Sequence, residues 1–460
     1  MMRKRIVLSM LVAILALFGT ACSGTSDSSN STGLSGDKAK NDGGVNANSE
    51  SEKVEIEFWY GLGGKLGETM EETIGEFNSS QNEVIVKGIK QADYSETNKM
   101  LQAAVASGEV PASFLCSHQT ATTLYKKGVV ERLNDYIAAD PGFNEADIIK
   151  SFYEYCKNDA GDVYSLPAWG TTQVIYYRKD MFETAGLDPD QVFKTWQNVA
   201  EASRKLKEIN SDVEGYYGFE PMYGMDCLLD IACSNGADIV SQDSKTVTFD
   251  SDAAIEAMEA VRNWINEEKI MGIHFGGEGW EYWYKTIDDV MQGRAGGYVG
   301  SSGDQGDLDF NIIAAHVQPG FGNNSPRPYV DPIIVGIMSG ASEEQKSAAF
   351  KWITYLNQTA TKEFAMKTGY VPVRSSVKDD PVFKEYLKDH PQALVPIEQA
   401  EIGRKKWYDI TGGKVEQALA DACDLIEIEN KPAAEALHKA KEIAQAALDE
   451  YWADAGEGDE

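Results

Sequence analysis

Segments with the periodicity of strands and segments with the periodicity of helices alternate from residue 54 onward, and this alternation limits the fold more than any other feature. Apolar or aromatic residues occupy every second position of 54–60, as in a half-buried strand. Apolar residues with helical spacing follow at 66–77, a second strand pattern at 84–89, a second helical pattern around 100–105 and a short strand pattern at 113–117. Strands that alternate with helices predict α/β layers and a largely parallel sheet.

Helices dominate the rest of the chain after one further strand at 174–177, which leaves a turn that contains proline and glycine. A chain of 460 residues is longer than one hydrophobic core usually serves, so we expect two lobes joined by crossing connections. Helical periodicity indicates six further helices, at 196–209, 253–268, 287–291, 344–357, 414–428 and 433–452.

The N-terminus has the pattern of an export signal. Basic residues at 3–5 precede the apolar run 6–18, and small residues follow it directly before Cys22. This run of thirteen residues, all apolar except Ser9, is too short to span a bilayer, which needs roughly 20. The segment resembles a bacterial lipobox, with Gly19 where an aliphatic residue is usual. We therefore expect a signal peptide over 1–21 and a lipid on the sulfur of Cys22, with an ordinary secretory signal as the alternative.

Residues 23–52 are rich in Ser, Gly, Asn, Asp and Lys and hold few sizeable apolar groups. Such a segment buries too little apolar surface to offset its ordering entropy, so we expect a flexible tether of roughly 30 Å end to end. Together with the lipidated cysteine, this predicts an anchored tether over 22–52. It would hold the rest of the chain at the extracellular face of the cell membrane.

Charge and motif spacing argue against several chemistries. The formal net charge of −31 opposes binding to nucleic acid and to anionic membrane surfaces. The glycine-rich stretch 61–67 matches neither the P-loop nor the dinucleotide fingerprint. The five histidines are scattered, the cysteines lack metal spacing, and no nucleophile elbow occurs. We therefore expect no cofactor, no metal site and no catalytic residue. Buried thiols are the expected state of the remaining cysteines, and a Cys227–Cys233 disulfide stays open.

Aromatic residues stand beside turns and small hydroxylated residues in five places, at 59–61, 169–172, 279–284, 369–372 and 407–408. Sugar rings present an apolar C–H face and a rim of hydroxyl groups, which aromatic platforms with polar partners match. Core packing is the competing explanation for each aromatic residue. The clusters nevertheless predict a carbohydrate site that draws on Trp169 with Thr172, on Trp280 and on Trp407.

The most specific patterns of the sequence are 58-FWYGLGGKLG-67 with 76-EFNSSQ-81, 107-SGEVP-111, 174-VIYYRKDMFETAGLDPDQVFKTWQNVAEASRKLK-207 and 350-FKWITYLNQTATKEFAMKTGYVPVRSSV-377. Together they resemble the extracellular solute-binding proteins of ABC importers, in sugar-binding family 1, and most nearly the glycerol-phosphate branch. The resemblance spans essentially everything after the tether.

The resemblance implies a two-lobed α/β fold of the periplasmic-binding-protein type II, whose lobes close on a ligand. In this chain, lobe one would consist of 53–168 plus 332–375, and lobe two of 169–331 plus 376–460. Its hinges would lie near Ala168–Thr171, near Val330–Ile333 and after Tyr370. Its ligand contacts would fall on Tyr60, Tyr94, Thr171, Ser301, Ser302 and Tyr370.

Departures from the glycerol-phosphate branch bear on the substrate. His118 stands about where that branch has an acidic residue, Asp331 where it has a hinge glycine, and Asp409 where it has a phosphate-binding Arg. Gly61 replaces a bulkier side chain and would widen the cleft. Carboxylates at 331 and 409 would oppose an anionic ligand and accept hydrogen bonds from hydroxyl groups. We therefore predict a neutral mono- or oligosaccharide.

Glycerol 3-phosphate or a glycerophosphodiester is the alternative ligand, with Arg404 or Lys405 holding the phosphate. In either case the resemblance implies a monomeric binding protein that captures its ligand between the lobes and delivers it to a membrane permease. It would make and break no bond. Two other classes stay open: an extracellular carbohydrate-active enzyme, which would release reducing sugar, and a sensor subunit that passes the ligand to a receptor.

Overall fold

The computed structural model describes residues 53–278 and 280–457. The predicted signal peptide, the lipidation of Cys22 and the tether lie outside the described residues and stay predictions. Among the helices within the described ranges, none combines the length and the apolar character needed to cross a membrane.

The eight strands within the described residues belong to one curled sheet with the order β2-β1-β3-β7-β4-β5, to which β6 is added on β4 and β8 on β7. The strands predicted at 54–60, 84–89 and 113–117 are confirmed, and the strand predicted at 174–177 forms the last part of a longer one. Their bounds are β1 (Val54–Tyr60), β2 (Val84–Lys90), β3 (Ser113–Ser117), β4 (Leu166–Arg178), β5 (Gly297–Ser301), β6 (Ile313–His316), β7 (Tyr329–Ile337) and β8 (Arg404–Lys405).

The sheet is mixed, so the expectation of a largely parallel sheet was wrong. β1 pairs in parallel with β2 and β3, as the strand–helix alternation of 54–117 requires. β7 pairs antiparallel with both β3 and β4, and β4 pairs antiparallel with β5 and β6. The reason is that the chain crosses the molecule along β4 and returns along β7, which places two long strands side by side in opposite directions.

The six helices predicted in the second part of the chain are confirmed, and α8 has the predicted bounds. Side-chain caps explain where α8 and α12 begin. Thr195 accepts a hydrogen bond from the N–H of Asn198 at the start of α8, and Ser342 forms a capping box with Gln345 at the start of α12. The helices are α1 (Gly64–Ser80), α2 (Tyr94–Ser107), α3 (His118–Lys126), α4 (Asn134–Ala139), α5 (Lys150–Tyr153), α6 (Lys179–Ala185), α7 (Pro189–Val192), α8 (Trp196–Ile209), α9 (Met225–Ser234), α10 (Asp252–Arg262), α11 (Glu281–Met291), α12 (Glu343–Tyr355), α13 (Thr361–Thr368), α14 (Pro381–Asp389), α15 (Val395–Glu401), α16 (Lys414–Glu427) and α17 (Ala433–Glu457).

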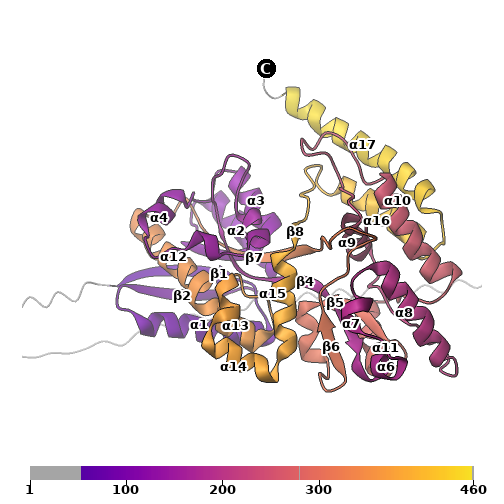
Figure 1. Cartoon of the computed structure of the whole chain (residues 1–460). Coiled ribbons are helices and arrows are strands. Elements are labelled where there is room, and N and C mark those ends of the chain that lie inside the picture. The colour runs from indigo at the N-terminus through magenta and orange to yellow at the C-terminus, as the bar shows by residue number, and fades with distance from the viewer. Residues whose placement is uncertain (1–52, 279, 458–460) are drawn as a thin grey trace, which may run out of the picture. The chain divides into compact units, whose positions relative to one another are not determined.

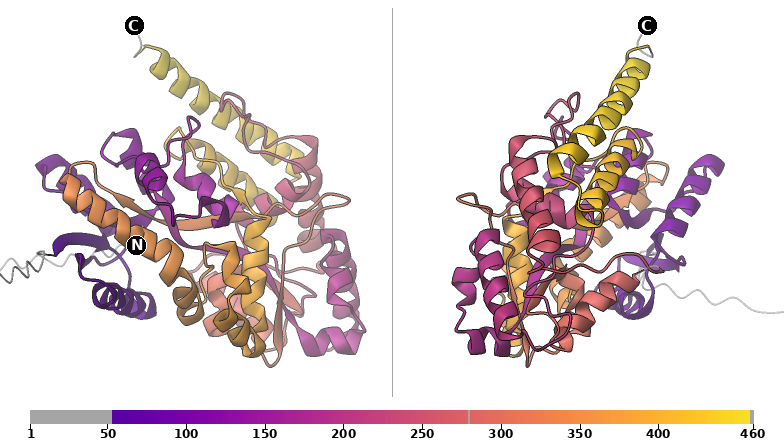
Figure 2. Two further views of the ribbon diagram at one scale, coloured as in Figure 1. Left: turned by 60° about the vertical axis from the view of Figure 1, so that its left-hand side comes forward. Right: turned by 90° about the vertical axis from the view of Figure 1, so that its right-hand side faces the viewer.

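The buried apolar side chains form two separate cores. The first is built from residues of 56–169 and 330–400, and the second from residues of 174–321 and 415–448. Figure 1 shows α1, α12 and α13 around the first core and α8, α10 and α16 around the second, with β4 and β7 between them. α16 and α17 pack against each other along the second core (Figure 2). Phe383 of α14 belongs to the first core.

The three segments predicted as hinges meet at Gly170. β4 pairs there with β7, so that Thr171 lies opposite Asp331. The N–H of Gly170 donates to the carbonyl of Val371 at 3.0 Å, and the N–H of Val371 donates back at 2.9 Å. A Cβ atom at position 170 would lie 2.2 Å from the ring of Phe152, so the packing requires glycine. The adjacency of the segments is a finding, and their action as hinges stays a prediction.

The five described cysteines are free thiols, and all of them are buried. This confirms the expected role of small apolar residues. Cys227 and Cys233, for which the sequence left a disulfide open, form none.

Candidate functional site

A cleft with a volume of about 680 Å³ lies where the paired strands β4 and β7 pass from one core to the other. Its lining comes from these two strands, from the turn before α9, from the start of α11, from the turn after β5 and from Tyr370. Seven lining residues are aromatic and four are aspartates. Among the described residues that line the cleft there is no lysine or arginine. The cleft thus offers apolar faces and hydrogen-bond acceptors.

One wall of the cleft consists of aromatic side chains at the start of α11. Trp280 and Tyr284 are 63% and 59% exposed, which is unusual for residues of this size. The ring of Trp280 meets that of Trp283 edge to face at 6.0 Å, and Tyr282 meets Tyr223 in the same manner at 5.4 Å. We call residues 280–284 the aromatic wall. Exposed, supported rings of this kind can stack on a ligand with an apolar face.

Asp304 holds the aromatic wall in place from behind. Its carboxylate accepts hydrogen bonds from the indole N–H of Trp283 at 3.0 Å, the hydroxyl of Tyr298 at 3.1 Å and the N–H of Ser301 at 3.0 Å. Burial raises the pKa of Asp304 to about 7, although these three donors lower it. Asp304 is therefore a positioning residue, since its oxygens are occupied by the protein.

Asp331 lies on the opposite side of the cleft, on β7. Burial raises its pKa to about 6, against the lowering effect of the Lys406 ammonium and with a smaller contribution from Asp226. Lys406 donates to Asp226 at 2.8 Å, and the hydroxyl of Tyr329 donates to the same carboxylate at 2.8 Å. No hydrogen bond to a described side chain occupies the Asp331 carboxylate, which leaves it free to accept a bond from a ligand.

Six of the predicted ligand residues line this cleft: Thr171, Thr172, Trp280, Ser301, Asp331 and Tyr370. Ser302 lies directly behind them, where its buried hydroxyl accepts a hydrogen bond from the N–H of Thr172 at 3.3 Å. Tyr94 begins α2 and is mostly buried; burial, followed by the proximity of Tyr370 and Asp331, raises its pKa. The structure therefore brings these residues together, and their contact with a ligand stays a prediction.

Three of the predicted residues are buried in or against the first core. Trp169 is 1% exposed and stacks on Phe364 with ring centroids 4.1 Å apart. Tyr60 is 2% exposed and stacks on Phe58. A Cβ atom at Gly61 would lie 2.1 Å from the carbonyl oxygen of Asp93, so this glycine allows close backbone packing.

The remaining three predicted residues lie away from the cleft lining. His118 is buried in a smaller hollow of about 370 Å³, where its ring meets Tyr155 edge to face at 4.5 Å. Burial, and then the charges of the nearby lysines, lowers its pKa to about 3. Trp407 lines another hollow of about 480 Å³. Asp409 accepts a hydrogen bond from the N–H of Thr411 at 2.8 Å and so shapes the turn before α16.

Sequence reasoning missed several residues of the cleft. Tyr223 and Asp226 precede or begin α9, where no motif marks them. Lys406 lies outside the lining but donates to Asp226, and the sequence does not distinguish it from its neighbours Arg404 and Lys405. Asp304 had a local signal, because Ser301 and Asp304 form a capping box at the turn after β5. The other residues could not be found without the fold that brings α9, β7 and β8 together.

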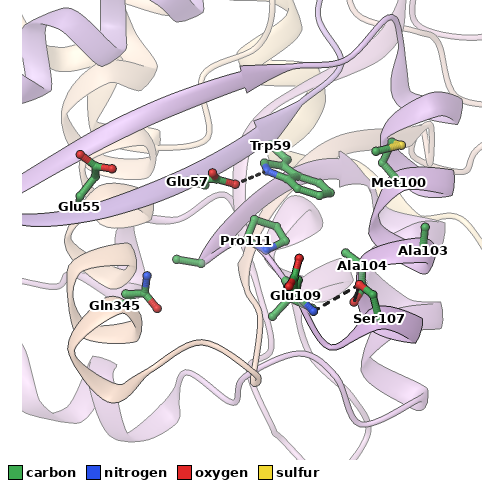
Figure 3. A pocket seen from close by; sticks show the side chains of 12 residues that line it. Glu55, Glu57, Trp59, Met100, Ala103, Ala104, Ser107, Glu109, Pro111 and Gln345 are labelled. Carbon is green, nitrogen blue, oxygen red and sulfur yellow. Dashed lines mark hydrogen bonds between the residues drawn. The ribbon is translucent and has the colours of Figure 1, made fainter. Parts of the chain in front are cut away.

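A second hollow, of about 650 Å³, lies beside β1 and α2 (Figure 3). Figure 3 shows Glu55, Glu57 and Glu109 around it, with the indole N–H of Trp59 donating to Glu57 at 2.9 Å. Its lining comes from 55–112 and Gln345 and does not include β4 or β7. The cleft at the crossing strands, rather than this hollow, is therefore the candidate site.

Two cores joined by crossing strands, with an aromatic and acidic cleft at the crossing, define a solute-binding protein. Comparison with known families agrees: a family model described as bacterial extracellular solute-binding protein matches residues 72–391, which is more than half of the chain. The chain belongs to this family.

Individual relatives and solved structures are similar to the chain over most of its length. The sn-glycerol-3-phosphate-binding periplasmic protein UgpB of Yersinia pestis bv. Antiqua is 24% identical over 358 residues, covering 75% of this chain and 80% of the relative. The cyclic alpha-maltosyl-1,6-maltose binding protein of Arthrobacter globiformis has a TM-score of 0.73 at 18% identity, covering 86% of this chain and 99% of that one.

Two further structures show the same fold. UgpB of Mycobacterium tuberculosis, in complex with glycerophosphocholine, has a TM-score of 0.71 at 22% identity and covers 86% of this chain and 99% of its own. The sugar-binding protein MalE of Xanthomonas citri has a TM-score of 0.76 at 16% identity and covers 86% and 98%. The expected two-lobed periplasmic-binding-protein fold is thereby confirmed. The relatives and neighbours named here are binding proteins rather than enzymes.

Proposed function

We propose that this chain is the substrate-binding lipoprotein of an ABC importer and that it captures a neutral mono- or oligosaccharide. The observation that carries the proposal is the composition of the cleft, where exposed aromatic rings face aspartates and no cationic side chain lines the described surface. Sugar C–H faces would stack on Trp280, and sugar hydroxyl groups would donate to Asp331. The bound ligand would stabilise the closed state by its higher affinity for it.

Glycerol 3-phosphate or a glycerophosphodiester is the second candidate, and the named activity of the UgpB relatives favours it. A phosphate needs donors that carry positive charge. The three consecutive basic residues at 404–406 already have partners: Arg404 donates to Asp230 at 3.2 Å, Lys405 to the carbonyl of Glu154 at 3.1 Å and Lys406 to Asp226 at 2.8 Å. A phosphate ligand would have to displace these partners, which supports a neutral ligand instead.

The organisation around the cleft follows from the same proposal. The lobes would be those predicted, with α14 and α15 moved to lobe one because Phe383 and Ile397 belong to the first core. Closure would bend β4, β7 and the segment after Tyr370 at Gly170. The chain would act as a monomer, held by a lipid on Cys22 outside the cell membrane, and would pass its ligand to permease subunits. It would need no cofactor and perform no catalysis.

The test is binding of the full-length chain, purified in detergent, to a panel of neutral saccharides, glycerol 3-phosphate and glycerophosphocholine. Calorimetry and a reducing-sugar assay would be run together. We expect saturable binding of a saccharide without turnover, weakened about tenfold or more by Trp280→Ala, since stacking on a ring contributes on the order of 1–2 kcal/mol.

Trp59→Ala is the matched control, because Trp59 lines the hollow of Figure 3 rather than the cleft. Equal losses from both variants would show that the ligand does not sit at the aromatic wall. Binding of the phosphorylated compounds alone would establish the second candidate, and released reducing sugar would establish an enzyme.

A further inference from the structure

Glu220, His274 and Asp289 come together at α11, although no metal-ligand spacing links them in the sequence. One potential ligand atom from each residue lies within 4.8 Å of the other two. Glu220 sits on an extended segment that bridges to Tyr298 of β5, His274 on the loop before α11, and Asp289 within α11. The three residues thus come from separate segments, which the fold brings together at one point.

Glu220 is the unusual member of this group. Its side chain is 0% exposed, and neither carboxylate oxygen has a hydrogen-bond partner among the described residues. Its Oε1 lies 4.0 Å from Nε2 of His274, and that nitrogen lies 2.8 Å from Oδ2 of Asp289. A buried carboxylate without partners is costly, so this one requires either a proton or a cation. It is directed at an imidazole and a second carboxylate, which are both metal-ligand groups.

We propose that Glu220, His274 and Asp289 bind a divalent transition-metal ion, with zinc as the best match. Imidazole nitrogen and carboxylate oxygen are both groups that bind zinc, and three such ligands leave a fourth tetrahedral position for water. Ligand atoms about 2.1 Å from a tetrahedral ion lie about 3.4 Å apart. The observed separations of 2.8 and 4.0 Å lie on either side of that spacing. The side chain of His274 is 32% exposed, which leaves a route of access.

The surrounding charges are compatible with a cation. Arg294 donates to Oδ1 of Asp289 at 2.6 Å, which leaves Oδ2 directed at His274. The same guanidinium donates to Asp288 at 2.5 Å, so its charge is shared between two carboxylates. Arg294 would therefore act as an outer partner that orients a metal ligand. Glu220 adds a further carboxyl group, whose Oε1 lies 4.0 Å from Nε2 of His274.

The site would have a consequence for the cleft. His274 and Asp289 lie on either side of the aromatic wall in the sequence, and a shared ion would tie both ends of this segment to Glu220. Trp280 and Tyr284 project from the segment with most of their surface exposed. A metal clip would therefore restrict the motion of the wall and favour the arrangement in which its rings are ready to stack on a ligand.

The test is titration of Zn²⁺ into the chelator-treated, full-length chain by calorimetry, followed by Co²⁺ absorption spectroscopy as a readout of coordination. The variants are Glu220→Gln, which keeps the shape of the buried side chain, and His274→Ala at a partly exposed position. His438→Ala is the matched control, because His438 also lies near a carboxylate, 3.8 Å from Asp250, but is largely exposed.

We expect one Zn²⁺ per chain, an affinity at least about tenfold lower in both variants, and no change in the control. Bound Zn²⁺ should also raise the melting temperature of the parent chain but of neither variant. The proposal is overturned if the parent chain shows no saturable binding, or if both variants bind as the parent does. Glu220 would then carry a proton shared with Asp289.

Discussion

Trp283 donates its indole N–H to Asp304 over 3.0 Å, and this bond connects the aromatic wall to the turn after β5. Because the same carboxylate accepts bonds from Tyr298 and Ser301, one side chain sets the distance between the strand that carries the turn and the ring that faces the cleft. The shape of the cleft therefore depends on a residue whose oxygens are all used within the protein.

Substitution of Asp304 by Asn should weaken ligand binding without removing any group that touches the ligand. Asn offers one acceptor oxygen where three donors converge, so at least one donor loses its partner at a cost of about 1–3 kcal/mol. We expect a loss of stability of this size in urea unfolding and a loss of affinity by calorimetry. Asp307→Asn is the control for stability, because Asp307 is exposed at the same turn. Unchanged stability and affinity would show that the bond to Trp283 has no structural role.

Stability should depend on pH through Asp331. Its pKa is about 6 in the folded chain, against an ordinary value of 3.8, because of burial. The folded state therefore binds more protons than the unfolded state between these values, and stability should fall as pH rises from about 4 to about 6. Asp331→Asn should remove this part of the pH dependence of the unfolding free energy. The variant should be more stable than the parent above pH 6 by about 1–3 kcal/mol. Urea unfolding at pH 4, 6 and 8 measures the difference.

The same substitution should act on binding in the opposite direction. A carboxylate accepts hydroxyl hydrogen bonds more strongly than an amide, so Asp331→Asn should lose about tenfold in saccharide affinity at pH 8. The affinity of the parent should fall below pH 6 as the carboxylate is protonated, and the profile of the variant should lack that step. A variant that binds as tightly as the parent at pH 8 would remove Asp331 from the proposed contacts.

Lys406 offers a test that separates a neutral ligand from an anionic one. Its charge lowers the pKa of Asp331, so Lys406→Gln should move the acid limb of the binding profile to higher pH. Saccharide affinity at pH 8 should then change less than about threefold, whereas a phosphate ligand held by Lys406 should lose on the order of tenfold or more. Lys388→Gln is the control, since Lys388 is exposed on α14 and pairs with Glu385.

Gly170 should tolerate no side chain. In Gly170→Ala the new methyl group would lie 2.2 Å from the ring of Phe152, and the strands would have to shift at a cost of about 1–3 kcal/mol. Gly306→Ala, where a methyl group meets nothing within 4 Å, is the matched control. Thermal unfolding measures both. If Gly170→Ala unfolds as the parent does, Phe152 moves freely and the crossing is less tightly packed than the structure indicates.

The elements of this fold were largely predictable from the sequence because their signals are local. The stripe of α8 and its cap at Thr195 lie within one short stretch, so its bounds were correct from pattern alone. β7 was not predicted as a strand, and its direction depends on pairing with β3 and β4, which are distant in the sequence. The expectation of a largely parallel sheet failed for that reason.

The candidate site likewise contains residues that the sequence predicted and residues that it did not. Thr171, Asp331 and Ser301, which the family resemblance suggested, lie together in the cleft lining, and their contact with a ligand stays a prediction. Aromatic residues were less predictable, since periodicity does not show which face of a strand meets the core. Trp169 and Trp280 were both expected beside turns, yet Trp169 lies within β4 and is 1% exposed, whereas Trp280 directly precedes α11 and is 63% exposed.

Trp169 therefore provides a direct test of core against cleft. It stacks on Phe364, and its indole N–H has no hydrogen-bond partner among the described residues. Trp169→Phe should lower stability by only about 1 kcal/mol, since the lost volume is partly offset by removal of an unpaired donor, whereas Trp169→Ala should cost about 3–5 kcal/mol. Both variants should retain saccharide affinity within about threefold wherever they are folded, in contrast to Trp280→Ala. Urea unfolding and calorimetry on the same samples separate the two effects. If Trp169→Phe keeps its stability and loses binding, Trp169 contacts the ligand and the cleft extends to the first core.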